Sequence, residues 1–165
     1  MALDPIPQST QSDGRWKIAY VPIASDPLSL ADIESVGKNM TYSFTPDGFN
    51  LARTQATVND PRLTLVQVLS RPGKVTETLA LKYVDSQDDD SAARVLTDGL
   101  EGYFVIRRGV DNDDAWAVGD EVDVIQFVLG VERPDAPTEN GVDTISRDAF
   151  ITAVTQRRAE LVAGE

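Results

Sequence analysis

Short stretches in which apolar and polar residues alternate recur along the chain, and this pattern predicts β-strands. One stretch runs from Arg15 to Ile23 and places Trp16, Ile18 and Tyr20 on the same side. The other strands expected from the pattern cover residues 40–45, 62–70, 74–84, 103–107, 120–130 and 142–154. Many short strands separated by turn signals are typical of an antiparallel sandwich or barrel.

The clearest hairpin signal joins residues 62–70 to residues 74–84. Arg71-Pro72-Gly73 between them is expected to turn the chain, since proline presets φ and glycine tolerates a positive φ. The returning strand has an apolar face that Glu77 interrupts, so we expect that end to reach solvent. The residues of this face are Val75, Glu77, Leu79, Leu81 and Tyr83.

Helical signals are few. Residues 92–100 are predicted as a helix, because Asp88-Asp89-Asp90 precede them at the positive end of a helix dipole and Gly99 or Gly102 can close it. Residues 28–36 fit either one or two helical turns capped by Ser29 or a loop. We therefore expect a mainly β fold: an antiparallel β-sandwich or half-barrel with one short flanking α-helix, an extended loop and terminal arms.

The 165 residues are expected to form a single domain. Residues 1–14 are polar and contain two prolines, which indicates an N-terminal arm. Residues 45–62 are expected to form an extended, hairpin-like loop that begins with the turn Pro46-Asp47-Gly48. Residues 155–165 are expected to be a frayed helix or a second arm.

Composition excludes several kinds of chemistry. The chain has no His and no Cys, so Ser-His-Asp and Cys-His arrangements, disulfides and the usual zinc sites are ruled out. With 15 basic and 27 acidic residues the net charge is −12, the wrong sign for gripping nucleic acid or an anionic membrane. No segment resembles a secretory signal or a membrane span. We predict a non-enzymatic protein without a cofactor or metal.

The segment between residues 111 and 123 is the most acidic part of the chain, with six acids and no base. An EF-hand counted from Asp111 would need Gly and Glu where Trp116 and Val122 stand, so the motif fails. Arg107 and Arg108 beside this segment favour a local ion network over a phosphate site. Trp116, an aromatic residue in a polar loop, either packs on its own domain or anchors a neighbour.

Five segments follow one another in a specific order along the chain: residues 41–50, 71–79, 82–84, 102–109 and 122–125. Together they resemble the major tail (tail tube) proteins of long-tailed phages that infect actinobacteria. Residues 41–50 are similar to a segment near the start of those proteins, and residues 71–79 and 82–84 fall where the family has a hairpin. Residues 102–109 and 122–125 match its central strands. The resemblance runs from about Trp16 to Ser146; the residues after Ser146 are not matched by it, and their role stays open.

The resemblance implies a structural virion protein located in the tail and assembled in the host cytoplasm. In that family six copies form a ring, and rings stack into a tube that conducts double-stranded DNA during ejection. The implied partners are further copies of the chain and the tape-measure, tail terminator and tail-tip proteins; DNA would pass without specific binding. Alternatives are a terminator or connector ring that does not polymerise, and a β-sandwich carbohydrate-binding module.

If subunits stack, two groups of residues are candidates for function. Contacts between subunits or rings are expected at the turn that opens the extended loop and at the tryptophan of the acidic segment: Pro46, Asp47, Gly48, Phe49, Asn50 and Trp116. Acids facing the lumen are expected, from strand position, at Glu77, Glu121 and Asp123.

Overall fold

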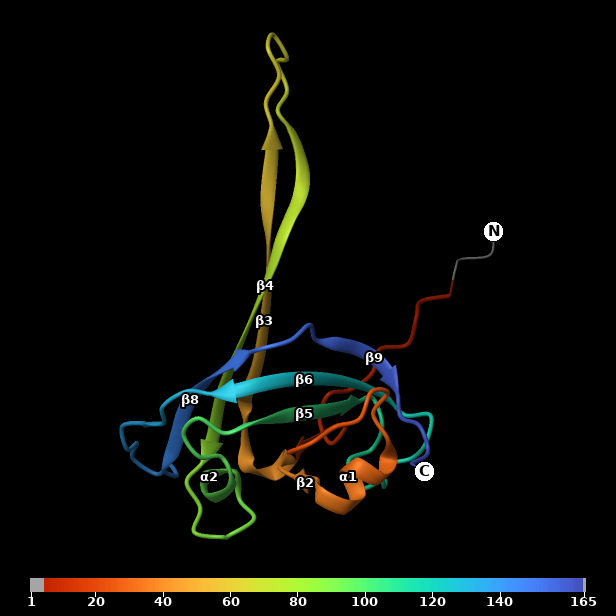
Figure 1. Cartoon of the computed structure of the whole chain (residues 1–165). Coiled ribbons are helices and arrows are strands. Elements are labelled where there is room, and N and C mark those ends of the chain that lie inside the picture. Colours follow the sequence, from red (N-terminus) through yellow and green to blue (C-terminus); the bar gives the residue numbers. More distant parts are fainter. Residues whose placement is uncertain (1–4, 165) are drawn as a thin grey trace. The chain divides into compact units, whose positions relative to one another are not determined.

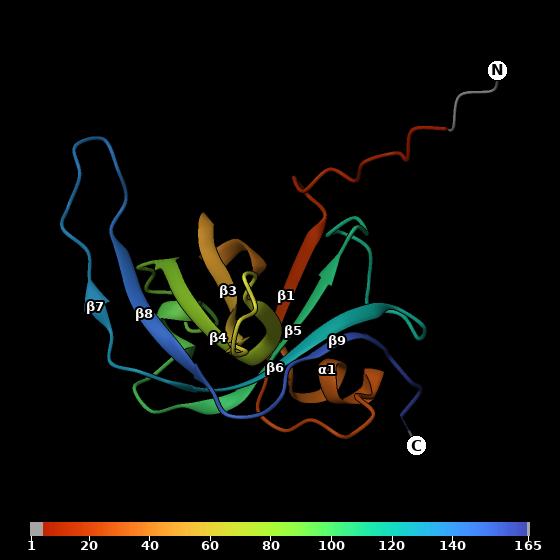
Figure 2. The same ribbon diagram turned by 90° about the horizontal axis from the view of Figure 1, so that it is seen from above.

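The computed structural model describes residues 5–164, and its strands pair antiparallel in every ladder described here (Figures 1 and 2). The expectation of a mainly β, antiparallel fold is confirmed. The chain forms two compact units. Unit 1 contains the residues up to Ser43, Glu101–Phe127 and the residues from Thr152 onward; unit 2 contains Phe44–Leu100 and Val128–Ile151. The expectation of a single domain stays a prediction, and residues 1–4 of the expected N-terminal arm lie outside the described residues.

Unit 1 is built on strands whose order is β2-β1-β5-β6, with β9 also paired to β6. The strands predicted at 15–23, 103–107 and 120–130 are confirmed as β1, β5 and β6, the last of which continues two residues into unit 2. The strand bounds are β1 Trp16–Val21, β2 Lys38–Asn39, β5 Glu101–Arg108, β6 Glu121–Leu129 and β9 Gln156–Glu160.

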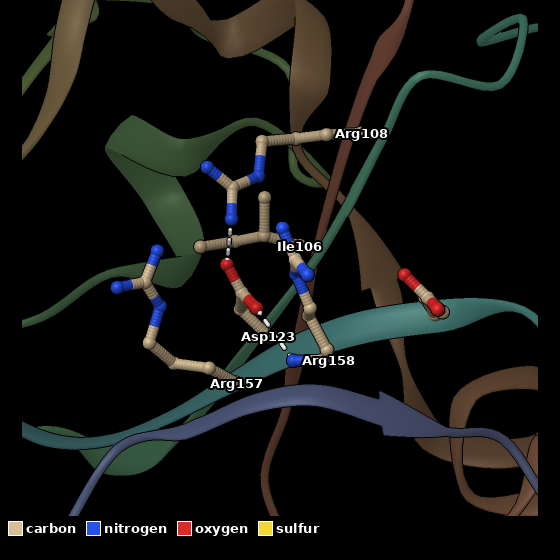
Figure 3. A pocket seen from close by; sticks show the side chains of 6 residues that line it. Ile106, Arg108, Asp123, Arg157 and Arg158 are labelled. Carbon is tan, nitrogen blue, oxygen red and sulfur yellow. Dashed lines mark hydrogen bonds and ion pairs between the residues drawn. The ribbon is translucent and has the colours of Figure 1, made fainter.

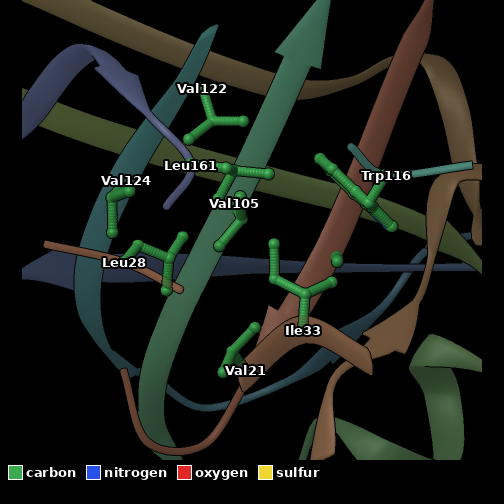
Figure 4. Close-up of a cluster of buried hydrophobic side chains, with 9 residues drawn as sticks. Val21, Leu28, Ile33, Val105, Trp116, Val122, Val124 and Leu161 are labelled. Carbon is green, nitrogen blue, oxygen red and sulfur yellow. The ribbon is translucent and has the colours of Figure 1, made fainter. Parts of the chain in front are cut away.

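The core of unit 1 covers both faces of β5 and β6, where most residues are buried. One face carries an aliphatic cluster with Trp116 at its edge (Figure 4). The other face stacks Phe104 on Phe127 with ring centroids 4.1 Å apart, and Tyr20 packs against both rings. The aliphatic cluster comprises Ala19, Val21, Leu28, Ile33, Val105, Trp116, Val122, Val124 and Leu161.

Helix α1, Leu30–Val36, covers this cluster with Ile33. The helical alternative for residues 28–36 is confirmed, and so is its cap, because Ser29 Oγ accepts from the Asp32 backbone N–H at 3.3 Å. The chain end lies beside this helix: the Leu30 N–H donates to Val162 O at 2.8 Å, and the Val162 N–H donates to Leu28 O at 3.1 Å. The segment expected as a frayed helix or arm instead contributes β9 and Leu161 to unit 1.

Unit 2 contains strands in the order β8-β4-β3, with β7 paired to β8. The strand predicted at 142–154 is confirmed as β8. Strands β3 and β4 are far longer than the others. The buried residues of β4 lie where it pairs with β8, at Leu79, Leu81 and Tyr83. The bounds are β3 Phe44–Asp60, β4 Leu69–Val84, β7 Arg133–Pro134 and β8 Thr144–Ile151.

The hairpin predicted between residues 62–70 and 74–84 is wrong. Strand β4 passes straight through Arg71-Pro72-Gly73 and pairs with β3 along its length. The pairing register shifts between Gln55 and Thr57, and this irregularity of the ladder accommodates the proline and glycine within the strand. A Cβ at Gly73 would lie 2.9 Å from Ala56 O, so glycine serves close approach of the two strands rather than a turn.

Two other local predictions also differ from the structure. Residues 41–43 form the 3-10 helix η1, Thr41–Ser43, where a strand was expected over 40–45. Helix α2 spans only Ala92–Val95, because Leu96 has an extended conformation at its C-cap and is itself buried. The predicted helix over 92–100 is therefore correct in its first turn alone.

Candidate functional site

The two long strands form a ribbon, defined here as residues 52–78, that pairs only with itself. Strand β4 meets β8 from Leu79 to Val84, and beyond that point the ladders described for residues 5–164 pair β3 and β4 only with each other. Figure 1 shows this two-stranded extension of unit 2. Nearly all its residues are exposed, with only Asp60, Gly73 and Glu77 half-buried. An isolated two-stranded ribbon is marginally stable in water, so a second surface is expected to support it.

Cross-strand polar contacts hold the ribbon together. Arg53 Nε lies 3.0 Å from Glu77 Oε1. Gln55 Nε2 donates to Gly73 O at 3.1 Å, beside the register shift. Nearer the turn, Asp60 Oδ2 accepts from Arg62 Nη2 at 2.8 Å and lies 3.9 Å from Arg71 Nη2. The pairs of Asp60 with the exposed Arg62 and Arg71 contribute little individually, about 0 to 1 kcal/mol each.

The tip of the ribbon, residues 61–68, presents large apolar side chains to solvent. Leu63 is 95% exposed and Val66 101% exposed, and Leu65 and Val68 are also exposed. Pro61 begins the tip, and Thr64 has a left-handed φ of 63°. Apolar residues gathered on an exposed loop are typical of an interaction site. Sequence reasoning placed these residues in a hairpin strand over 62–70, whereas residues 61–68 form the turn between β3 and β4.

The ribbon also differs from the rest of the chain in charge. Residues 52–78 contain four basic and two acidic residues, a net charge of +2 against −12 for the whole chain. The remaining residues therefore carry −14. A basic segment on an acidic protein is complementary to the surface of another copy of the same chain.

The acidic loop, residues 109–120, is organised by a buried arginine in unit 1. Arg107 is 1% exposed, and its guanidinium donates to Asp111 O, Asp114 O and Ala115 O at 2.8 to 3.0 Å. It also pairs with Asp120 Oδ2 at 2.9 Å. The loop thus turns its carbonyl oxygens toward the cation while the carboxylates of Asp111, Asp113 and Asp114 face solvent. The local ion network expected for Arg107 is confirmed.

Trp116 packs within its own unit, which is one of the two alternatives left open by the sequence. Its ring is 8% exposed, and its Nε1 donates to Asn39 Oδ1 at 3.3 Å. Lys17 Nζ and the Arg107 guanidinium carbon lie 5.5 and 5.1 Å from the ring centroid. Burial lowers the pKa of the Lys17 ammonium, and the Arg107 charge lowers it further. A contact between subunits at Trp116 stays a prediction.

The five other candidate contact residues lie at the base of β3 rather than on a loop. The register jumps there from Phe44 opposite Tyr83 to Phe49 opposite Leu81, so the residues from Thr45 to Gly48 bulge out of the ladder. Pro46, Asp47 and Asn50 are exposed, whereas Gly48 is buried and Phe49 packs edge-on against Phe44. A Cβ at Gly48 would lie 2.0 Å from Lys82 O.

The three candidate lumen acids have different surroundings. Glu121 is exposed at the start of β6. Glu77 is half-buried in the ribbon and pairs with Arg53. Asp123 is 7% exposed and pairs with Arg108, and its Oδ1 accepts from the Arg158 N–H at 3.0 Å. These surroundings distinguish the three acids, and their placement in a lumen stays a prediction.

Within residues 5–164, no group of three or more acidic side chains is arranged to hold a metal ion. The helices in that range are also too short or too polar to cross a membrane.

Comparison with known proteins agrees with this geometry. The family described as "Phage tail tube protein" matches residues 4–164. Among solved structures, a chain of the anti-feeding prophage baseplate, determined by cryo-EM with six-fold symmetrisation, superposes with a TM-score of 0.58. It is 10% identical, and the match covers 91% of this chain and 96% of that one, which shows a shared fold. No curated protein sequence matches. Because the family match spans nearly the whole sequence, the chain belongs to the phage tail tube protein family.

Proposed function

We propose that this chain is the repeating subunit of a phage tail tube, in which six copies close into a ring and rings stack into a hollow conduit for double-stranded DNA. Family membership supports a structural role in the virion tail. The fold likeness to a chain from a six-fold symmetrised assembly is consistent with a ring. Implied partners are the tape-measure protein inside the tube and the terminator and tip proteins at its ends.

The observation that carries this proposal is the ribbon. It is exposed on both faces, basic on an acidic chain and apolar at its tip. The basic ribbon would contact an acidic surface on the neighbouring copy. Because the two contacting surfaces are different parts of the chain, the contact is head-to-tail. Head-to-tail contacts generate rings when the rotation closes and open stacks when it does not. The ribbon therefore connects one copy to another ring, with the tip anchored on the neighbour.

The net charge fits passage of DNA. A basic wall would neutralise phosphates, release counterions and hold the DNA. Carboxylates leave the counterions on the DNA and let it slide. Glu77, Glu121 and Asp123 are the proposed acids of the lumen, and Glu121 has the exposure that this role requires.

Electron microscopy of the purified full chain tests the proposal. Hollow tubes of stacked rings are expected at high protein concentration. Single rings that never stack would instead support a terminator or connector, and monomers at every concentration would reject a tube subunit.

A ribbon deletion tests the assigned contact. The variant replaces residues 53–77 with Asn-Gly, which joins Ala52 to Thr78 through a two-residue turn. The rest of the ladder is preserved because Ala52 and Thr78 are opposite each other. The shortened chain is expected to keep its circular dichroism spectrum and thermal transition but to form no tubes. Tube formation by this variant would show that the ribbon does not connect subunits.

A further inference from the structure

Unit 1 contains a second feature that is unusual in so acidic a chain: a pocket of about 240 Å³ lined by three arginines. Figure 3 shows the side chains of Arg108, Arg157 and Arg158 gathered around Asp123. Glu121 and Ile106 complete the lining. The chain has only 15 basic residues, so three in one pocket are a marked concentration of positive charge.

The acid at the centre of the pocket is already engaged. Asp123 Oδ2 pairs with Arg108 Nη2, and Asp123 Oδ1 accepts from the backbone N–H of Arg158 at 3.0 Å. Arg108 is further fixed by Trp16, whose ring centroid lies 5.4 Å from its guanidinium carbon. Among residues 5–164, the guanidinium groups of Arg157 and Arg158 have no carboxylate within ion-pair distance. Two cations therefore remain available for an external anion.

The backbone of β9 is shaped to aim both arginines into this pocket. Consecutive residues of a regular strand point to opposite faces. Here the ladder between β6 and β9 is irregular between Val122 and Val124, and Arg158 has a left-handed φ of 53°. An arginine in that conformation is strained, and such strain is concentrated at functional positions. The bulge thus brings two neighbouring arginines to the same pocket.

We infer that this arginine pocket binds carboxylates of a second copy of the chain, and that the occupant is the acidic segment Asp88-Asp89-Asp90. Three guanidiniums against two lining carboxylates leave the pocket with a net charge of +1. Arginine binds carboxylates through paired hydrogen bonds, which gives both energy and geometric specificity. The inference rests on the proposed self-assembly and names one contact within it.

The choice of this segment follows from exposure, charge and position. All three aspartates are exposed, and within the part of the chain that the structure describes neither Asp88 nor Asp89 forms an ion pair. The segment belongs to unit 2 and the pocket to unit 1. A contact between these two different surfaces on separate copies is head-to-tail, as ring formation requires.

Charge exchange tests the inference. The first variant is R157E/R158E, the second D88K/D89K, and the third combines all four substitutions. R157E/R158E and D88K/D89K alone are each expected to assemble only at a protein concentration at least about tenfold higher than the wild type, as measured by sedimentation and electron microscopy. The combined variant is expected to recover assembly near the wild-type concentration, because opposite charges meet again with their positions exchanged.

The matched control neutralises two arginines elsewhere. R15Q/R133Q removes the same charge as R157Q/R158Q, and its residues are exposed and outside the pocket. R157Q/R158Q is expected to weaken assembly and the control to leave it unchanged, with the thermal transition of both near that of the wild type. Equal assembly by both neutralised variants overturns the inference. Failure of the exchanged variant, with its fold intact, overturns Asp88–Asp90 as the occupant.

These experiments distinguish failure of the proposed function from failure of the arginine pocket contact alone. If the wild-type chain forms no rings or tubes, the proposed function fails. If wild-type tubes form and the arginine variants form them equally well, only the arginine pocket contact fails.

Discussion

Arg107 Nη1 lies 2.9 Å from Asp120 Oδ2, and this pair closes the acidic loop between β5 and β6. The arginine is buried while the aspartate is partly exposed. The same guanidinium bonds three carbonyl oxygens of the loop, so one side chain replaces the hydrogen bonds that a regular turn would supply.

Replacing Arg107 by Ala is expected to lower the free energy of unfolding by about 3 to 5 kcal/mol, because Asp120 and the loop carbonyls lose their donor. Urea unfolding followed by tryptophan fluorescence measures this effect. Arg15→Ala is the matched control: Arg15 is exposed, its Nη1 donates to Gly109 O at 3.3 Å, and a loss below about 1 kcal/mol is expected. Equal losses for the two variants would contradict the role given to Arg107.

The bulge at the base of the ribbon predicts a strong effect of a single methyl group. Gly48→Ala is expected to destabilise the protein by more than about 2 kcal/mol, since the added Cβ meets the Lys82 carbonyl. Gly99→Ala is the control, because its φ is +75° but nothing lies within 4 Å of the added Cβ. About 1 kcal/mol is expected there from the left-handed backbone alone. Thermal unfolding of both variants measures the two losses of stability.

The apolar tip predicts a defect in assembly without a defect in folding. Val66→Asp places a charge where the side chain is fully exposed, so the unfolding free energy is expected to change by less than about 0.5 kcal/mol. Tube formation is expected to be lost, because the charge would have to be buried in the neighbouring copy. Val154→Asp, at a valine 92% exposed away from the ribbon, is the control for the same change. Tubes of normal length from Val66→Asp would exclude a buried tip.

The Asp135 carboxyl predicts a response to acid. Thr144 Oγ1 donates to its Oδ2 at 2.7 Å and Ser146 Oγ to its Oδ1 at 2.8 Å, and these bonds lower its pKa below the ordinary value of 3.8. Because the folded pKa is depressed, the stabilisation is complete above the unfolded pKa and is lost as pH falls through the folded one. NMR titration of the carboxyl carbon checks this, and Thr144→Val is expected to move the pKa back toward 3.8.

The strands of unit 1 could be predicted because their side chains are buried by the chain itself. In β5 and β6 nearly every position is apolar or paired, and the segments are bounded by turn residues. Strand β9 could not be found this way, since Gln156-Arg157-Arg158 carry no apolar pattern. It forms through backbone hydrogen bonds to β6, which leave little trace in side-chain composition.

The ribbon shows a different limit of sequence patterns. Alternation at Leu63, Leu65 and Leu69 predicts burial but not which molecule provides it. All three side chains are exposed in the single chain. Arg71-Pro72-Gly73 has the composition of a turn, yet a register shift accommodates it within β4. The extent of α2 was missed for a related reason: Asp98 pairs with the buried Arg147 at 3.2 Å, a contact that periodicity does not indicate.

The exposed ribbon also affects how separate copies of the chain can contact one another in solution. Beyond Thr78 and Ala52, the ladders described for residues 5–164 leave both outer edges of the ribbon without a neighbouring strand, and unpaired strand edges can pair with another chain. Pro72 has no backbone N–H to donate, and its neighbours Arg71 and Lys74 add positive charges to the same strand. Proline and charged residues on an edge strand oppose pairing with a further strand, so contacts between copies through the ribbon are expected to use side chains.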